Sequence, residues 1–185
     1  MGEWEMSESY TYRLKPLPEG ELKGIFLVTH DVLLRTKQVL VDYALAGIDD
    51  GGHEGLVYWA GREMGETTAF LAAVAPDADH SAQRVQASKQ AIAKAARACR
   101  AVRLGMLCQV HSHPGQGTYH SDGDDEMVLL PFEGMLSLVA PKYGITLENL
   151  SDFGVHQFQK GTWVHCSRQS VQNNLIVVPS LLDLR

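Results

Sequence analysis

Two histidines separated by one residue are the first feature of this sequence that could do chemistry. They lie in the run His111-Ser112-His113-Pro114, directly after an apolar stretch that is typical of a β-strand. Because alternate residues of a strand point to the same face, both imidazoles can reach one metal ion. A carboxylate brought to that point by the Gly-rich turn that follows would give three protein ligands and leave one position for water. Such an open arrangement is what a catalytic zinc site needs.

Several carboxylates could supply the third ligand, because the segment after the histidines is acidic. The candidates are Asp122, Asp124, Asp125 and Glu126. Ser121, just before them, could also be only the N-cap of a helix with acidic residues in its first turn. Two histidines beside a proline could likewise belong to a surface turn. Each feature alone favours the simpler interpretation, whereas their joint order and spacing favour the metal site.

The order of these residues resembles the HxHP…SxxD signature of the JAMM, or MPN-plus, metalloproteases. In this chain the signature is HSHP at 111–114, six further residues, and Ser121-Asp122-Gly123-Asp124. Members of the family also place a glutamate upstream, at the edge of an early strand, and the segment 53–61 is similar to that region in order and hydrophobic pattern. The resemblance covers roughly residues 22–168.

The resemblance implies a metal centre with three protein ligands. His111, His113 and Asp124 would bind one Zn²⁺ per chain, together with a bound water. Asp124 is preferred because it fits the spacing of the signature and would face the site three residues after Ser121. Asp125 is the alternative third ligand.

Two catalytic residues are also implied by the resemblance. Glu54 would act as general base and general acid, taking a proton from the water and handing it to the leaving amine. Ser121 would donate a hydrogen bond to the tetrahedral oxyanion. Glu63 and Glu66 compete for the first role, but they fall in a predicted hairpin tip, whereas Glu54 precedes its strand.

The same family suggests the substrate. JAMM-type enzymes cut after the C-terminal glycine of ubiquitin or a ubiquitin-like protein, so we expect an isopeptidase or peptidase that deconjugates or processes such a protein. This short chain resembles compact prokaryotic members, for which operon-encoded activating and conjugating enzymes of an antiviral defence system are expected partners. A peptidase that processes a sulfur-carrier protein, and a catalytically silent MPN scaffold that only binds partners, are the alternatives.

The site requires a sheet and helices to position it, and the hydrophobic patterning supplies both. Helices are predicted over Val32–Ala46 and Ser81–Val102, the second with Ser81 as its cap. Strands are predicted over Gly24–His30, Leu56–Ala60, Thr67–Val74, Met106–Val110, Gly134–Ala140, Phe153–Gln159, Thr162–Cys166 and Leu175–Val178. The expected fold is α+β, a mixed α/β/α sandwich with a curved, mostly antiparallel sheet flanked by helices. The family resemblance adds that this is a cytidine-deaminase-like JAB/MPN domain.

Length and composition narrow the classes further. We expect a polar arm over residues 1–20 and one domain over 21–185, with a C-terminal extension from about 169. The net charge of −6 argues against a nucleic-acid partner, and no apolar run is long enough to predict a membrane partner. Three widely spaced cysteines without a CxxC pair favour a reducing compartment, so a cytoplasmic location is expected. Cys108, close to His111, is interpreted as a small buried hydrophobe.

Overall fold

The computed structural model describes residues 15–128 and 131–180, which form a curled mixed sheet flanked by helices. Most of the predicted N-terminal arm and the last five residues of the chain lie outside the described residues. The helices are α1 (His30–Ala46), α2 (Lys89–Ala101), α3 (Asp122–Met127) and α4 (Arg168–Asn174), with short 3₁₀ turns at Ile48–Asp50, Lys142–Gly144 and Leu150–Asp152. No helix in this described part of the chain is both long and apolar enough to cross a membrane.

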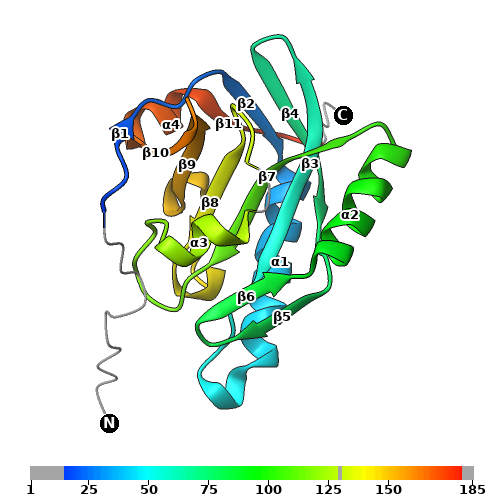
Figure 1. Cartoon of the computed structure of the whole chain (residues 1–185), viewed down its shortest axis with the longest axis vertical. Helices are drawn as coiled ribbons and strands as arrows, with labels where there is room; N and C mark the ends of the chain where they lie inside the picture. Colours follow the sequence, from blue (N-terminus) through cyan, green and yellow to red (C-terminus); the bar gives the residue numbers. More distant parts are fainter. Residues whose placement is uncertain (1–14, 129–130, 181–185) are drawn as a thin grey trace, which may run out of the picture.

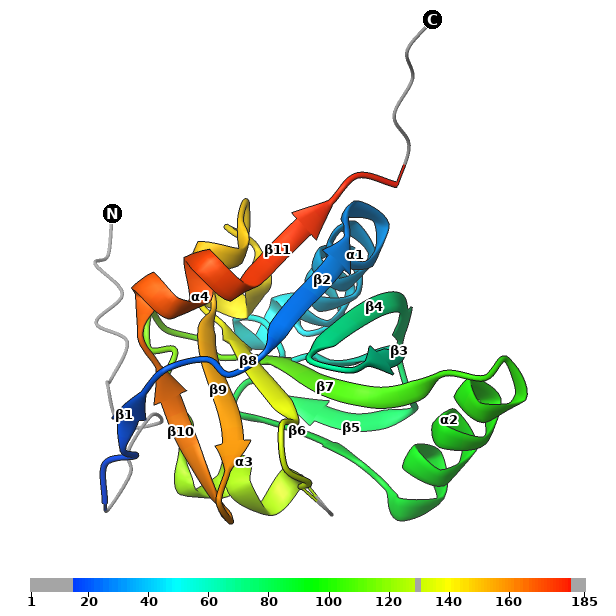
Figure 2. The same ribbon diagram turned by 90° about the horizontal axis from the view of Figure 1, so that it is seen from above.

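Nine strands form one sheet in the order β1-β10-β9-β8-β7-β3-β4-β2-β11 (Figure 1). They are β1 (Glu19–Gly20), β2 (Ile25–Thr29), β3 (Leu56–Met64), β4 (Thr67–Val74), β7 (Gly105–Ser112), β8 (Leu136–Ala140), β9 (Gly154–Gln159), β10 (Thr162–Cys166) and β11 (Leu175–Val178). The two longest pairings, of β3 with β4 and with β7, are antiparallel, and parallel pairs lie at both edges and between β7 and β8. Figure 2 shows how far the strand direction turns between β10 and β3.

The predicted strands and the first helix are confirmed, apart from shifts of a few residues at their ends. Alternating burial explains this agreement, because strands with one face on a core carry a period of two in the sequence. Residue 19 marks the start of β1, which pairs with β10, and the segment from 169 contributes α4 and β11, which pairs with β2. The end of the described chain is therefore part of the main sheet.

The predicted helix over Ser81–Val102 is wrong in its first part. Residues 78–87 form a hairpin of β5 (Ala78–Ser81) and β6 (Arg84–Ala87), and the helix begins only at Lys89, with Ser88 as its N-cap. Helix propensity is high over this stretch, but Val85 and Ala87 alternate into a buried cluster against β3, and tertiary packing overrides the propensity. The two-residue turn contains no glycine or asparagine that would have indicated a hairpin.

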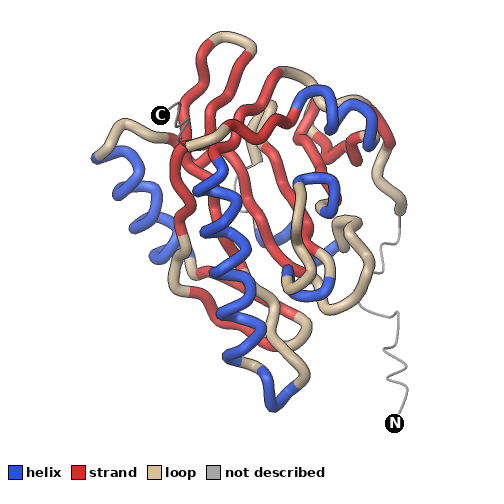
Figure 3. Tube along the Cα trace, turned by 180° about the vertical axis from the view of Figure 1, so that it is seen from behind, coloured by secondary structure: helices blue, strands red, loops and turns tan. Residues whose placement is uncertain are grey.

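The larger hydrophobic core lies between the sheet and α1, which crosses the sheet in the rear view of Figure 3. Trp59, fully buried at its centre, donates its indole hydrogen to Thr36 Oγ1 of α1 at 2.7 Å. Cys108 belongs to this core and is fully buried, and burial raises the pKa of its thiol well above the usual range. The interpretation of Cys108 as a buried hydrophobe is thus confirmed.

The opposite face of the central strands carries polar groups. Along β3 and β7, residues that alternate with the core positions face α3, α2 and the β5–β6 hairpin, which lie in front of the sheet in Figure 1. The register pairs Leu56 with His111 and Tyr58 with Gln109. Both predicted histidine ligands therefore belong to the face that the larger core leaves uncovered.

Candidate metal centre

The structure brings His111, His113 and Asp124 together in one buried cluster. One ligand atom from each lies within 4.8 Å of the other two. The Nε2 atoms of the two histidines are 3.2 Å apart, and each lies 3.2 Å from a different oxygen of Asp124. Their exposed fractions are 0%, 3% and 5%, so the cluster is shielded from bulk water.

The end of β7 positions the two histidines. His111 is the last paired residue of β7 against β3, and it pairs with Val139 of β8 on the other side. The backbone continues beyond β7, where the His113 amide donates to the Ala140 carbonyl at 2.8 Å. Both imidazoles are thus held by main-chain bonds to neighbouring strands.

Ser112, between the histidines, points the other way and connects β7 to the segment that carries Glu54. Its Oγ accepts a hydrogen bond from the Gly55 amide at 2.9 Å, and its own amide donates to the Gly55 carbonyl at 3.1 Å. The Glu54 amide in turn donates to the Ser81 carbonyl at the end of β5. The β5–β6 hairpin, where the sequence predicted helix from Ser81, therefore helps to position Glu54.

Asp124 reaches the cluster from α3, whose start is a capping box. Ser121 Oγ accepts from the Asp124 amide at 3.2 Å, while Asp124 Oδ2 accepts from the Ser121 amide at 2.6 Å. The Ser121 hydroxyl, expected at the oxyanion, thus also caps the helix that carries the third ligand. The helix-cap interpretation of the SxxD segment is confirmed, and it is compatible with the position of Asp124 beside the two histidines.

Asp125 faces a different group. Its Oδ1 lies 3.2 Å from Nδ1 of His120, and His120 Nε2 lies 2.7 Å from Ser137 Oγ on β8. His120 is fully buried and its ring stacks on His156, with ring centroids 4.3 Å apart. Asp124, rather than Asp125, is the carboxylate that joins His111 and His113.

The glutamate expected as acid and base is buried beside this cluster. Burial raises the pKa of Glu54 to about 8, the charge of His113 partly opposes this shift, and the charge of Asp124 adds to it. Its exposed fraction is 6%, whereas the competitors Glu63 and Glu66 are exposed. A carboxyl group with such a pKa can both accept and release a proton near neutral pH.

The same electrostatics differentiate the three candidate ligands. Burial alone would raise the pKa of Asp124, but the charges and hydrogen bonds of His111 and His113 outweigh it and hold the pKa far below its usual range. Burial lowers the pKa of His111, because it exceeds the opposing effect of Asp124. For His113 burial also acts to lower the pKa, yet the hydrogen bond and charge of Asp124, with the charge of Glu54, raise it.

The donor atoms fit a divalent metal. His113 Nδ1 lies 3.2 Å from the Gly117 carbonyl oxygen, which can only accept, so Nδ1 is the donor of this contact and Nε2 is the nitrogen that would bind a metal. Two imidazole nitrogens and one carboxylate are a donor set that zinc takes in catalytic sites, with a fourth position open. The residues present could therefore hold a metal ion without rearrangement of the sheet.

Several supporting residues were missed from the sequence. They are the Gly117 carbonyl, which contacts His113, and the Ser112 hydroxyl, which accepts from the Gly55 amide. Only the position of Ser112 between two ligands carried any signal, since alternation on a strand directs it to the opposite face.

Comparison with known proteins gives the following matches. Residues 45–148 match the family described as prokaryotic homologs of the JAB domain, a range that includes every predicted site residue. The chain is similar to the probable metalloprotease y4jG of Sinorhizobium fredii (strain NBRC 101917 / NGR234), with 31% identity over 108 residues, 54% of this chain. The match spans 63% of that relative's own length. The solution structure of protein DSY2949 from Desulfitobacterium hafniense shares the fold, with a TM-score of 0.63 and 15% identity over 85% of this chain and 95% of that one.

Proposed function

Because this chain belongs to the prokaryotic homologs of the JAB domain, we propose that it is a zinc-dependent metallopeptidase whose metal is held by His111, His113 and Asp124. The observation that carries the proposal is one geometric fact. Three buried ligand atoms of the types that zinc prefers converge within 4.8 Å beside a buried glutamate. When bound, the metal would polarise the scissile carbonyl and acidify a water molecule.

The residues of the chain perform the remaining chemistry. Glu54 accepts the proton of the attacking water at its carboxylate and delivers it to the nitrogen of the leaving amine, a task that its raised pKa suits. Ser121, at the start of α3, donates its hydroxyl hydrogen to the carbonyl oxygen as negative charge develops there. The buried position of these groups excludes bulk water, which strengthens each electrostatic interaction.

We further propose that the bond cut follows the C-terminal glycine of a ubiquitin-like protein, either in a conjugate or in a precursor. The family resemblance and the order of the site residues support this substrate class. A glycine at the cleaved position suits a centre that is almost completely buried, because a residue without a side chain lets its carbonyl approach most closely.

The experiment that tests the metallopeptidase is a zinc measurement combined with a cleavage assay. We expect about one zinc per chain, because the described residues contain one such cluster. The substrate is a ubiquitin-like protein encoded beside the gene and fused through its C-terminal glycine to a reporter. Glu54→Gln should keep the zinc and lose cleavage, whereas His113→Ala should lose both. A folded protein that takes up no zinc when it is supplied would contradict the proposal.

A further inference from the structure

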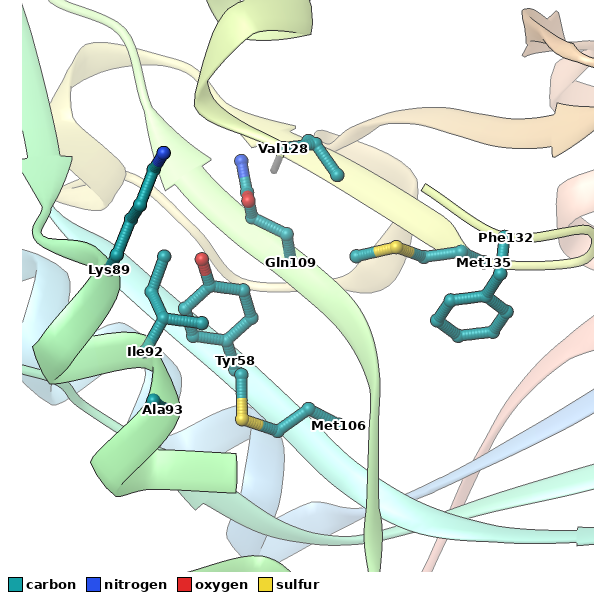
Figure 4. A pocket seen from close by; sticks show the side chains of 9 residues that line it. All are labelled: Tyr58, Lys89, Ile92, Ala93, Met106, Gln109, Val128, Phe132 and Met135. Atoms are coloured by element: carbon teal, nitrogen blue, oxygen red, sulfur yellow. The ribbon is translucent and has the colours of Figure 1, made fainter. Parts of the chain in front are cut away.

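A pocket of about 480 Å³ opens beside the candidate metal centre, on the same face of the sheet. Tyr58 of β3 and Gln109 of β7 pair with each other and line it, one pair along from Leu56 and His111. The walls are mostly apolar: Ile92 and Ala93 come from α2, where Lys89 also lines the pocket, and Met135 comes from the segment before β8. Figure 4 shows Gln109 between the side chains of α2 and that of Met135.

Gln109 is the unusual member of this lining. Its side chain is fully buried, and among the groups that the structure describes neither its Nε2 nor its Oε1 has a hydrogen-bond partner. A buried carboxamide with both ends unpaired is rare and costly, because each end has lost its water without gaining a replacement. A ligand that offers one acceptor and one donor side by side would satisfy both ends.

A peptide backbone offers that pair of groups. Since the pocket follows the same two strands as the metal centre, an extended peptide whose scissile bond lies at the metal can continue across it. At about 3.3 Å per residue along a strand, Gln109 lies about 7 Å beyond His111, so the pocket corresponds to a substrate residue roughly two to four positions from the cut. The size of the pocket, 480 Å³, lies within the usual range for ligand sites.

We propose that this pocket is a specificity subsite, in which an apolar side chain of the substrate lies against Ile92, Ala93 and Met135 while the Gln109 carboxamide binds the adjacent main-chain amide. The inference rests on the proposed peptidase function and adds to it a preference for a large aliphatic residue near the cleaved bond. Tyr58 and Gln109 lie two residues along β3 and β7 from Leu56 and His111 and point to the same face, and this proximity argues for a substrate segment as the occupant of the pocket.

The test uses N-acetylated pentapeptides of sequence Ser-Ser-Ser-Gly-Gly in which leucine replaces each serine in turn. Their binding to the zinc-loaded Glu54→Gln protein, which does not turn them over, is measured by calorimetry. We expect leucine at one position to tighten binding about tenfold or more over serine, as burial of an aliphatic side chain allows. Equal affinity for all four peptides would overturn the proposal.

Two variants of α2 test whether the preference for leucine arises in this pocket. Ala93→Phe fills the pocket and should remove the advantage of leucine, whereas Ala98→Phe, on an exposed position of the same helix, should retain it. If the preference for leucine persists in Ala93→Phe, the side chain binds elsewhere and the pocket is not the subsite.

Gln109→Leu should change protein stability and peptide affinity in opposite directions. Replacing an unpaired buried carboxamide by an apolar group of similar size should raise the melting temperature. The same change should weaken every peptide of the series about tenfold, because the main chain loses its two partners. Unchanged peptide affinity, whatever the melting temperature does, would overturn the role of Gln109.

These outcomes are separable from those of the peptidase proposal. A protein that binds zinc and cleaves its fusion substrate but shows no preference for leucine refutes the subsite alone. A protein that takes up no zinc, but whose metal-free form prefers leucine in the same peptide series, refutes the peptidase and leaves a peptide-binding module.

Discussion

The two histidines and the aspartate that we propose as metal ligands are held in different ways. His111 lies in β7 and His113 directly follows it; this central strand is bonded to β3 on one side and β8 on the other. Asp124 belongs to the six-residue helix α3, which has a capping box at its start. Asp125 of the same helix contacts His120, which in turn contacts Ser137 on β8. Sheet register therefore sets two ligands, and a few side-chain contacts set the third.

This difference indicates which parts of the site are sensitive to mutation. A ligand pair fixed by a ladder of main-chain bonds tolerates changes in neighbouring side chains, because the backbone bonds do not depend on residue type. A ligand on a short helix depends on each of its anchors, since a helix of this length has little stability of its own. Mutations around α3 should thus act on metal binding, and mutations around β7 on the register of the strands.

The largest effect is expected from loss of a strand-borne ligand. His113→Ala removes a donor atom held just beyond the end of β7, and zinc affinity should fall by more than the roughly 10–100-fold typical of losing a supporting group. Competition with a chelator measures the affinity. The metal-free variant should keep its circular-dichroism spectrum, and retention of tight zinc binding would mean that the histidine pair is not the core of the site.

His120→Leu tests the anchor of the helix-borne ligand. The substitution keeps an apolar side chain in the buried position but removes the bonds to Asp125 and Ser137. We expect zinc affinity to fall about tenfold, because Asp124 is then less firmly positioned. Tyr119→Phe, at an exposed position next to it, is the control and should bind zinc normally. Equal affinities would remove the distinction between the two kinds of ligand.

Ser112→Ala tests the histidine pair, which the main-chain bonds of β7 hold. It leaves the buried Gly55 amide without its side-chain acceptor, which should lower the free energy of unfolding by about 1–3 kcal/mol. Zinc affinity should stay unchanged, since the main-chain bonds of β7 persist, whereas cleavage should slow because Glu54 follows Gly55. Denaturant unfolding, chelator competition and the fusion-cleavage assay measure the three quantities, and a large loss of zinc would contradict the assignment.

The smallest effect on stability is expected from changes at Ser121, which can distinguish its role as a helix cap from its role at the oxyanion. Ser121→Ala should lower the free energy of unfolding by about 1 kcal/mol, whereas Ser121→Gly should cost only a few tenths, because glycine is tolerated at an N-cap. Both variants remove the hydroxyl that we assign to the oxyanion, so kcat should fall equally in both. If kcat instead follows stability and recovers in the glycine variant, the hydroxyl acts only as a cap.

How much of this was predictable depends on the range of the interaction. The strands β3, β4 and β7 and the helix α1 were found from the sequence, since alternation and helical periodicity are local. The hairpin β5–β6 was not, because residues 81–87 have helical propensity and only their packing against β3 makes them strands. The sequence likewise places Gln109 two residues before His111, on the same strand face, but it does not show that the carboxamide of Gln109 has no partner.

By itself, the sequence determined that two histidines on one strand face share a point and that a capped acidic turn follows them. Those features depend on the period of a strand and on the spacing of a cap, both of which are properties of neighbouring residues. Only the tertiary structure decided which aspartate meets the histidines, where Glu54 lies, and that a pocket with an unpaired carboxamide continues from the site. Each of these depends on contacts between residues far apart in the chain, and no local pattern records them.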